Sequence, residues 1–273
     1  PTAVATRATM ASMIGIIAGS GYYELPGLLQ RKDELFTNEY GQATVSMGTW
    51  DNIPIAFVAR HGGDHSIPPN AINYRANIKS LKDLGVESVF AVNVVGSMVA
   101  DRGPGSLFIV DDFIEFTQAR QCTFFDRPGE VTHTDMTSVY DPELRAILIR
   151  AAELESQDVT KTATYVCTDG PRFETPAEIR MFTQLGAHVV GMTGYPEVAL
   201  AREAGLRYAS IAVVSVVAIM SSERPTKYSR QRSAFFHALY DDSDDEVGRG
   251  AFSEIPISAI TATPKTQGAF SVT

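Results

Sequence analysis

Apolar runs that end in small or polar residues recur along this chain and limit its possible folds more than any other feature. Each run is short enough to be a buried strand, and several are followed by a segment with helical periodicity. This alternation predicts an α/β fold around a central, mostly buried sheet. Ligands in such folds bind beside the carboxyl ends of strands. Five of these ends are Gly19-Ser20, His61-Gly62, Gly96-Ser97, Asp169-Gly170 and Thr193-Gly194.

The strands and helices expected from the pattern cover most of the chain up to residue 220. The expected strands are 13–18, 43–47, 53–59, 89–95, 106–110, 162–167, 188–192 and 210–220. The expected helices are 71–84, 142–155, 176–185 and 196–204, the first with Asn70 as its N-cap. Residues 118–138 show no periodicity. Long ordered loops in enzymes often form a site wall or an interface, and we expect one of these roles here.

The run 53–59 leads directly into Arg60 and His61, followed by two glycines. A core strand that ends in this way brings cationic and titratable groups to the sheet edge, where glycine lets the backbone approach a ligand. We therefore expect an anion site here, joined by the Gly19–Gly21 turn. Arg60 could instead form a surface ion pair, His61 and His65 could be ordinary strand-end histidines, and the glycine turn could be a plain tight turn.

Composition narrows the function classes and suggests three parts of the chain. The 273 residues carry a formal net charge of −9, which argues against a general nucleic-acid binder. No apolar run is long enough to span a bilayer, and the two cysteines form no metal or redox motif, so we expect a cytoplasmic protein with reduced thiols. We expect a loose arm or expression remnant at 1–12, one domain at 13–220 and a divergent, partly irregular segment at 221–273.

Several longer strings match a known family. They are Ile16–Gly21, Ala59–Gly62, Asn73–Asn77, Gly96-Ser97, Asp169–Thr175 and Gly191–Glu197. On these residues the chain resembles the trimeric purine nucleoside phosphorylases, most closely their 5′-methylthioadenosine phosphorylase branch. The resemblance implies a single-domain fold with a central mixed, twisted sheet flanked by helices. It also implies a homotrimer with shared sites that cleaves a purine nucleoside with inorganic phosphate and needs no cofactor or metal.

The resemblance also implies roles for particular residues. Ser20, Arg60, His61 and Thr193 would hold phosphate, together with the backbone of Val94, with Arg60 and His61 also counted as catalytic. A guanidinium and hydroxyls suit that task. On the nucleoside side, the implied contacts are Asn93, Met192 under the ribose, Phe173 against the purine, and His133 offered to a neighbouring subunit. Without the resemblance, Phe173 and Met192 would be read as core residues, and Glu174 and Glu197 as helix caps.

The last strand departs from the family pattern. There the family reads the base with a polar residue, Asp for 6-aminopurines or Asn for 6-oxopurines, and this chain has Val216 in that position and Ala218 at a second one. Ser215 is the nearby hydroxyl and the remaining catalytic candidate. We therefore expect a phosphorylase for a 5′-methylthioadenosine-like or 6-oxopurine nucleoside. The alternatives are a family member that binds without efficient turnover and a nucleosidase that uses water.

Overall fold

The computed structural model describes residues 12–21, 24–25 and 27–218, and these form one mixed sheet with helices on its faces. The expected arm and the segment 221–273 lie outside the described residues, apart from residue 12, so these two boundaries stay predictions. The α/β architecture predicted from the sequence is confirmed. No helix in the described part of the chain is long and apolar enough to cross a membrane.

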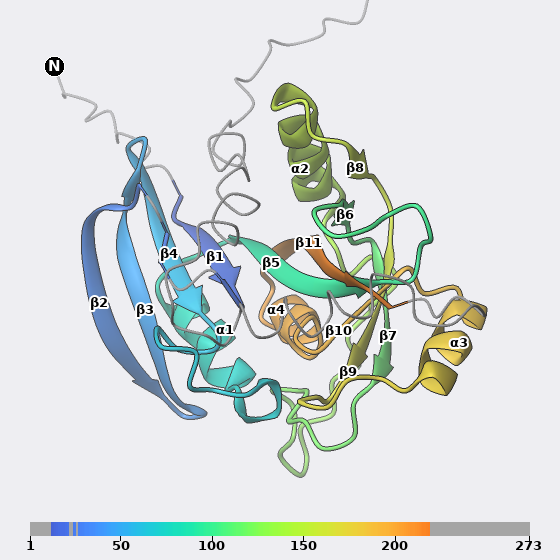
Figure 1. The fold of residues 1–273 in the computed structure, drawn as a ribbon. Helices are drawn as coiled ribbons and strands as arrows, with labels where there is room; N and C mark the ends of the chain where they lie inside the picture. The colour runs from blue at the N-terminus through green and yellow to red at the C-terminus, as the bar shows by residue number, and fades with distance from the viewer. Residues whose placement is uncertain (1–11, 22–23, 26, 219–273) are drawn as a thin grey trace, which may run out of the picture.

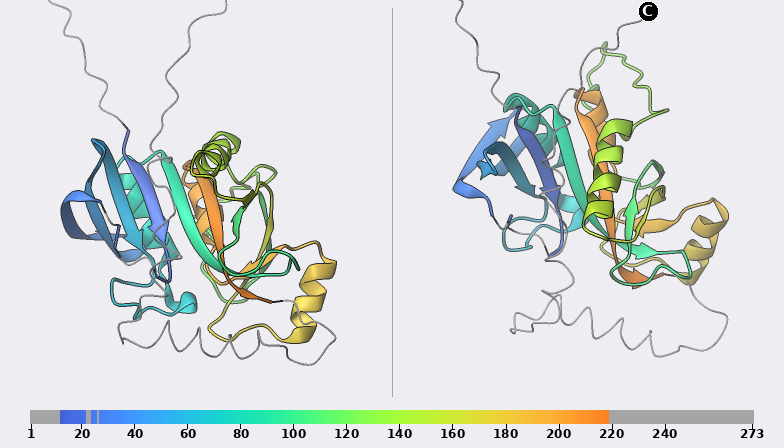
Figure 2. Two further views of the ribbon diagram at one scale, coloured as in Figure 1. Left: turned by 45° about the horizontal axis from the view of Figure 1, so that its top comes forward. Right: turned by 90° about the horizontal axis from the view of Figure 1, so that it is seen from above.

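The sheet has eleven strands among the described residues. Eight of them follow the order β2-β3-β4-β1-β5-β10-β9-β7, while β11 pairs with β5 and β6, and β6 pairs with β8. Figure 2 shows β2–β4 at one end of the molecule and α3 at the other. The strands are β1 (Ile14–Ala18), β2 (Leu29–Asn38), β3 (Gly41–Trp50), β4 (Ile53–Ala59), β5 (Ser88–Ser97), β6 (Leu107–Ile109), β7 (Asp112–Phe116), β8 (Val159–Thr160), β9 (Thr164–Thr168), β10 (Val189–Gly191) and β11 (Arg207–Val217).

β5 crosses the middle of the molecule and organises the site (Figure 1). One edge of β5 pairs with β11. The other edge pairs with β1 up to Ala91 and with β10 from Gly96 onward. Between these points, residues 92–95 have no strand partner on that edge among the described residues. β1 and β10 diverge here. The end of β1 and the turn that follows β10 therefore face the same open stretch of β5, which suits a ligand site between strand ends.

Helices cover both faces of the sheet. They are α1 (Tyr74–Asp83), α2 (Pro142–Leu154), α3 (Pro176–Gln184) and α4 (Glu197–Glu203), with a short 3-10 helix at Pro69–Ala71. α1 and α4 bury Ile78, Leu81 and Leu200 in one large core. α2 buries Leu144 and Leu148 in a second core, which also contains residues of β1 and β11. α3 packs in a smaller cluster beside β9 and β10. The two main cores hold the central strands from both sides and fix where their ends lie.

The differences from the expected elements have local causes. β2 was not predicted because its residues are mostly exposed and four of its ten residues are charged, so its sequence has no buried stripe. β7 and β8 were also not predicted. Helix α1 begins at Tyr74 rather than residue 71, because Ile72 is extended and the side chain of Asn73 accepts a hydrogen bond from the Ala76 N–H at 3.0 Å. Asn73, not Asn70, is therefore the N-cap.

The last strand contains a bulge that the sequence pattern does not reveal. Val214 pairs with Val95 and Val216 pairs with Gly96, so Ser215 is an extra residue on β11. A bulge redirects neighbouring side chains, and it breaks the rule that adjacent strand residues face opposite sides of a sheet. Ser215 and Val216 accordingly both line the cavity described below.

Candidate active site

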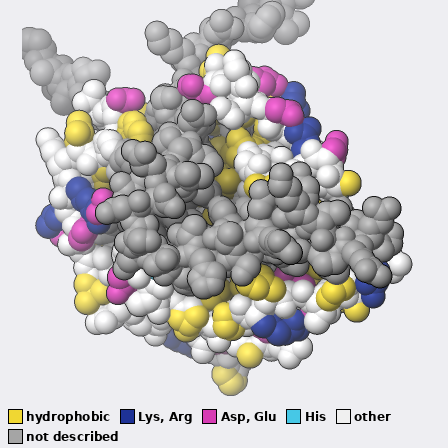
Figure 3. Space-filling model, viewed as in Figure 1, with side chains coloured by type: hydrophobic (Ala, Val, Ile, Leu, Met, Phe, Trp, Pro, Cys, Tyr) yellow, Lys and Arg dark blue, Asp and Glu magenta, His cyan; other side chains and the backbone are white. Residues whose placement is uncertain are grey.

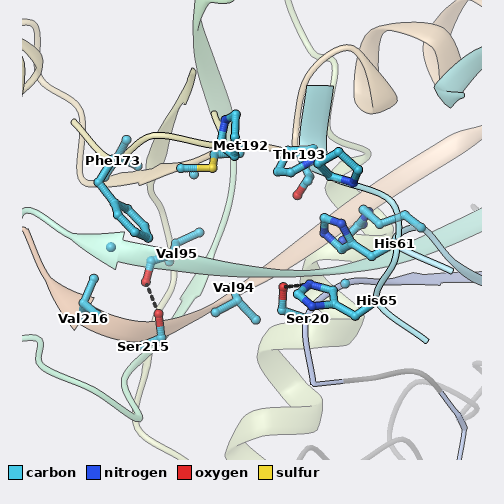
Figure 4. Close-up of a pocket in the computed structure, with 18 of the residues that line it drawn as sticks. Ser20, His61, His65, Val94, Val95, Phe173, Met192, Thr193, Ser215 and Val216 are labelled. Carbon is cyan, nitrogen blue, oxygen red and sulfur yellow. Dashed lines mark hydrogen bonds between the residues drawn. The ribbon is translucent and has the colours of Figure 1, made fainter. Parts of the chain in front are cut away.

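A cavity of about 460 Å³ lies at the open stretch of β5. Its walls come from the segments after β1, β4, β9 and β10, from β5 itself and from the end of β11. Figure 4 shows Ser20, His61 and His65 at one end of this cavity and Phe173, Ser215 and Val216 at the other. The strand ends singled out from the sequence thus meet at one cavity. The first end is called the polar corner below and the second the apolar end.

The polar corner is built from residues that follow β1 and β4. Ser20 Oγ lies 3.2 Å from His65 Nε2, and the rings of His61 and His65 meet edge to face with centroids 5.0 Å apart. His61 Nδ1 donates to the Ile67 carbonyl at 2.8 Å. Burial lowers the pKa of His61 to about 4, with further lowering by the charges of Arg60 and His65. His61 is therefore neutral at pH 7, and because Nδ1 carries the proton, Nε2 is a hydrogen-bond acceptor.

Arg60 also lines the cavity, but most of its guanidinium is already bonded. Nε and one Nη donate to the two carboxylate oxygens of Glu197 at 2.9 and 2.8 Å, and the other Nη donates to the Val92 carbonyl at 2.8 Å. Both side chains of this ion pair are buried. Burial opposes the charge of Arg60, and Glu197 outweighs it and holds the arginine pKa above its ordinary value. Since a guanidinium has five N–H groups, two have no hydrogen-bond partner among the described residues and remain for a ligand, one on each Nη.

The neighbourhood of Arg60 explains two sequence features. Gly19 is required because a Cβ there would lie 2.8 Å from an Nη of Arg60. Glu197, interpreted as a possible helix cap, is instead the buried partner of Arg60 and also accepts from the Tyr208 hydroxyl at 2.7 Å. The ion pair considered as the alternative reading of Arg60 therefore exists, in the interior rather than on the surface.

Thr193 completes the polar corner from the turn after β10. Its Oγ1 accepts from Asn93 Nδ2 at 2.9 Å, and Asn93 in turn accepts from the Ser210 hydroxyl at 2.7 Å. The Thr193 O–H is therefore left to donate to a ligand. Asn93 is fully buried and lies behind Thr193 rather than among the lining residues. The hydroxyl of buried Tyr165, which sequence reasoning missed, accepts from the backbone N–H groups of Thr193 and Gly194.

The apolar end holds the nucleoside-side candidates. Phe173, Met192, Val216 and Ala218 line it, and Val94 lines the floor between the two ends. The Ser215 hydroxyl donates to the Val95 carbonyl at 3.3 Å, which leaves its lone pairs for a ligand. Glu174 also lines the cavity, and its carboxylate accepts a hydrogen bond from the Thr168 hydroxyl at 2.7 Å. The sequence analysis did not assign this residue to the base.

His133 is the site candidate that the structure keeps apart from the others. It is exposed in the irregular segment between β7 and α2 and does not line the cavity. That segment contains no helix or strand, as expected from the sequence. Within the described ranges no group of three or more His, Cys, Asp or Glu side chains could hold a metal ion. In Figure 3, acidic and basic side chains both lie along the outer edge of the view, and the described part of this face shows no continuous basic area.

Comparisons with known proteins identify the family of this chain. The phosphorylase superfamily matches residues 13–234. A probable 6-oxopurine nucleoside phosphorylase of Moorella thermoacetica is 47% identical over 218 residues, covering 79% of this chain and 83% of the relative. The S-methyl-5′-thioadenosine phosphorylase of Pyrococcus furiosus is 45% identical over 205 residues, covering 74% and 78%.

A solved structure gives the same result for the fold. Methylthioadenosine phosphorylase from Schistosoma mansoni, in complex with adenine, superposes with a TM-score of 0.77 at 31% identity and covers 91% of this chain and 90% of its own. The resemblance noted from the sequence motifs is thereby confirmed. This chain belongs to the phosphorylase superfamily, in the branch shared by the 6-oxopurine and the methylthio-nucleoside phosphorylases.

Proposed function

We propose that this chain cleaves the N-glycosidic bond of a purine nucleoside with inorganic phosphate, releasing the free base and ribose 1-phosphate or its 5-methylthio analogue. It is then a pentosyltransferase. The observation that carries the proposal is one cavity with hydrogen-bond donors at one end and apolar side chains at the other. Phosphorolysis needs that pairing, because the anion and the base must flank the same sugar carbon.

Phosphate belongs at the polar corner in this proposal. The two remaining N–H groups of Arg60 and the Thr193 hydroxyl supply donors, and Ser20 adds a further hydroxyl. The backbone of Val94 lies on the unpaired stretch of β5 and is the main-chain contact that we assign. His61 offers an acceptor at Nε2, which suits an oxygen that still carries a proton, as in the monohydrogen phosphate dianion.

The sugar and base belong beside Met192 and Phe173. Glu174 favours a 6-oxopurine, because a carboxylate accepts from the N1–H of such a base, whereas N1 of adenine carries a lone pair. Relatives named 6-oxopurine nucleoside phosphorylase and probable S-methyl-5′-thioinosine phosphorylase, at 45% and 49% identity, support a 6-oxopurine, while the 45% identical S-methyl-5′-thioadenosine phosphorylase is named for a 6-aminopurine, so Glu174 carries the choice of base. The 5′ position then carries a hydroxyl or a methylthio group.

The reaction passes through a sugar with oxocarbenium character, as in other glycosidic cleavages. A phosphate oxygen forms a bond to C1′ as the C1′–N9 bond breaks, and the bonding electrons leave with the purine. The proton that monohydrogen phosphate gives up in becoming the sugar phosphate balances the one that the purine gains. Val216 cannot hydrogen-bond the departing base. The missing contact favours slow turnover, since one lost leaving-group hydrogen bond costs about 3 kcal/mol in barrier. The alternative proposal of a binder without efficient turnover rests on this residue.

The deciding experiment is an assay of base release from inosine, 5′-methylthioinosine, adenosine and 5′-methylthioadenosine, with and without phosphate. We expect phosphate-dependent release from the two inosine nucleosides. Release that ignores phosphate would indicate hydrolysis by water. Calorimetric binding of phosphate without any base release would favour the binding protein. Preference for the adenosine pair would overturn the role given to Glu174.

The quaternary structure and location belong to the same proposal. We propose a homotrimer in which exposed His133 reaches the 5′ end of a nucleoside held by a neighbouring subunit. A cytoplasmic location fits the two free cysteines, Cys122 and Cys167. Light scattering of the purified chain should give three times the chain mass, and His133→Ala should raise KM for the nucleoside but not for phosphate. A monomer with full activity would contradict the shared site.

A further inference from the structure

Arg120 is a buried arginine outside the cavity that contacts two turns that carry different parts of the site. It belongs to the irregular segment between β7 and α2, and its side chain is 4% exposed. Nothing in the sequence marks it, because its neighbours show no periodicity and the strand-end pattern does not include it. Its surroundings are unusual for an arginine, since most of its partners are main-chain carbonyls.

The guanidinium joins two turns that are far apart in the sequence. One Nη shares its two N–H groups among three carbonyl oxygens, those of Thr168 at 3.1 Å, Asp169 at 3.0 Å and Met192 at 2.6 Å. The other Nη donates to the Tyr195 carbonyl. Four carbonyl oxygens therefore converge on one rigid, planar group, one from the last residue of β9, one from the turn after β9 and two from the turn after β10.

Two further contacts fix the orientation of Arg120. Its guanidinium lies 5.3 Å from the centroid of the Tyr74 ring, at the start of α1. Its Nε lies 3.5 Å from a carboxylate oxygen of Asp169, and the other oxygen of that carboxylate accepts from the Gln118 N–H at 3.0 Å. The segment at 118–120 and the turn after β9 thus hold each other from both sides.

These two turns carry separate parts of the cavity. The turn after β9 continues to Phe173 and Glu174 at the apolar end, and the turn after β10 supplies Met192 and Thr193, which reaches the polar corner. We propose that Arg120 is a positioning residue that sets the spacing between the base-binding turn and the phosphate-binding turn. The proposal rests on the function proposed above, and Arg120 itself touches no substrate.

The test replaces Arg120 with lysine, which keeps the charge but cannot reach four carbonyls in a plane. Calorimetry measures phosphate alone and hypoxanthine alone, and steady-state kinetics measures inosine phosphorolysis. We expect each ligand to bind within about threefold of wild type, because each turn is intact, while kcat falls about 100-fold, the usual effect of an error near 1 Å in reactant placement.

Arg75→Lys is the matched control. Arg75 is also largely buried and binds the same irregular segment through Thr123 and Asp126, but it touches neither turn. It should keep kcat within about threefold. Arg120→Lys with wild-type kcat would overturn the proposal. So would loss of phosphate and hypoxanthine binding in parallel with the melting temperature, because that pattern marks a purely structural residue.

The role of Arg120 can also be tested if the proposed phosphorylase function is wrong. If the wild-type chain releases no base, the phosphorylase assignment fails, and Arg120 is judged by binding alone. Phosphate should then change the affinity for hypoxanthine in the wild type and in Arg75→Lys but not in Arg120→Lys. Equal coupling in all three proteins would overturn the positioning role.

Discussion

The two ends of the cavity are built on opposite principles. At the polar corner the side chains are buried and held by their own hydrogen bonds: Arg60 by Glu197, His61 by the Ile67 carbonyl and Thr193 by Asn93. At the apolar end Phe173 is 49% exposed and Val216 offers no polar atom. The corner is preorganised for an anion before any ligand arrives. The apolar end offers the purine mainly an apolar contact surface, with the Glu174 carboxylate and the Ser215 hydroxyl as its polar groups.

The largest effect is expected when the carboxylate that holds Arg60 at the polar corner is removed. Glu197→Ala leaves a buried guanidinium without its counter-charge, and we expect a loss of about 3–5 kcal/mol in the free energy of unfolding. The double variant Arg60→Met with Glu197→Leu should be less destabilised than Glu197→Ala alone, because no charge is left unpaired. Urea unfolding measures both. Equal losses would mean that the ion pair does not organise the corner.

A second prediction concerns phosphate binding at the same arginine. Arg60→Lys keeps a positive charge but loses the planar fork, so it cannot serve Glu197 and a ligand together. We expect kcat/KM for phosphate to fall about 100-fold or more, with KM for the nucleoside changed less than about threefold. Initial rates over a grid of both substrates give the two values. An equal effect on both substrates would remove Arg60 from the phosphate site.

The same comparison shows how far the sequence reaches. The strand-end pattern predicted that the ends carrying Ser20, Arg60, His61 and Thr193 meet at one site, and these residues do line one cavity. Only the family resemblance assigned Thr193 to phosphate. Their partners could not be predicted, because Glu197, Asn93 and Tyr165 come from distant elements and look like a cap, a strand residue and a core residue. These pairs are separated by 28 to 137 residues in the sequence, and such pairing is decided by tertiary packing and not by local pattern.

At the apolar end, the sequence predicted the correct strand but not the bulge within it. Val216 was expected near the base by alignment, and it does line the cavity. The bulge at Ser215, which turns both residues toward that cavity, leaves no mark in the alternation of a strand that is apolar on both faces. Arg120 and Glu174 were missed for a related reason: they lie in irregular segments, where periodicity says nothing about burial.

A third prediction uses the depressed pKa of His61. Its pKa is about 4 in the folded chain and near 6.5 when unfolded, so between these values the unfolded state binds the extra proton. The His61 contribution to stability is therefore complete above pH 6.5 and is lost as the pH falls toward 4. Going from pH 7 to pH 5, the wild type should lose about 2 kcal/mol more unfolding free energy than His61→Gln. Urea melts at both pH values test this, and identical losses would contradict a buried, neutral His61.

The smallest expected effect comes from adding a polar side chain at the apolar end of the cavity. Val216→Asn adds a group that can both donate to and accept from a purine, next to the bulge that points residue 216 into the cavity. We expect kcat for inosine to rise about tenfold, part of what a leaving-group hydrogen bond contributes, while KM for phosphate stays unchanged because the polar corner is untouched.

Val217→Asn is the matched control, since Val217 is the next residue on β11 and does not line the cavity. It should leave kcat for inosine within about twofold of wild type, because an amide outside the cavity cannot reach the departing base. A rise in Val217→Asn, or none in Val216→Asn, would show that the base is read elsewhere. Glu174 would then be the polar side chain at this end that governs departure of the base, and the absence of a polar residue at 216 would no longer imply slow turnover.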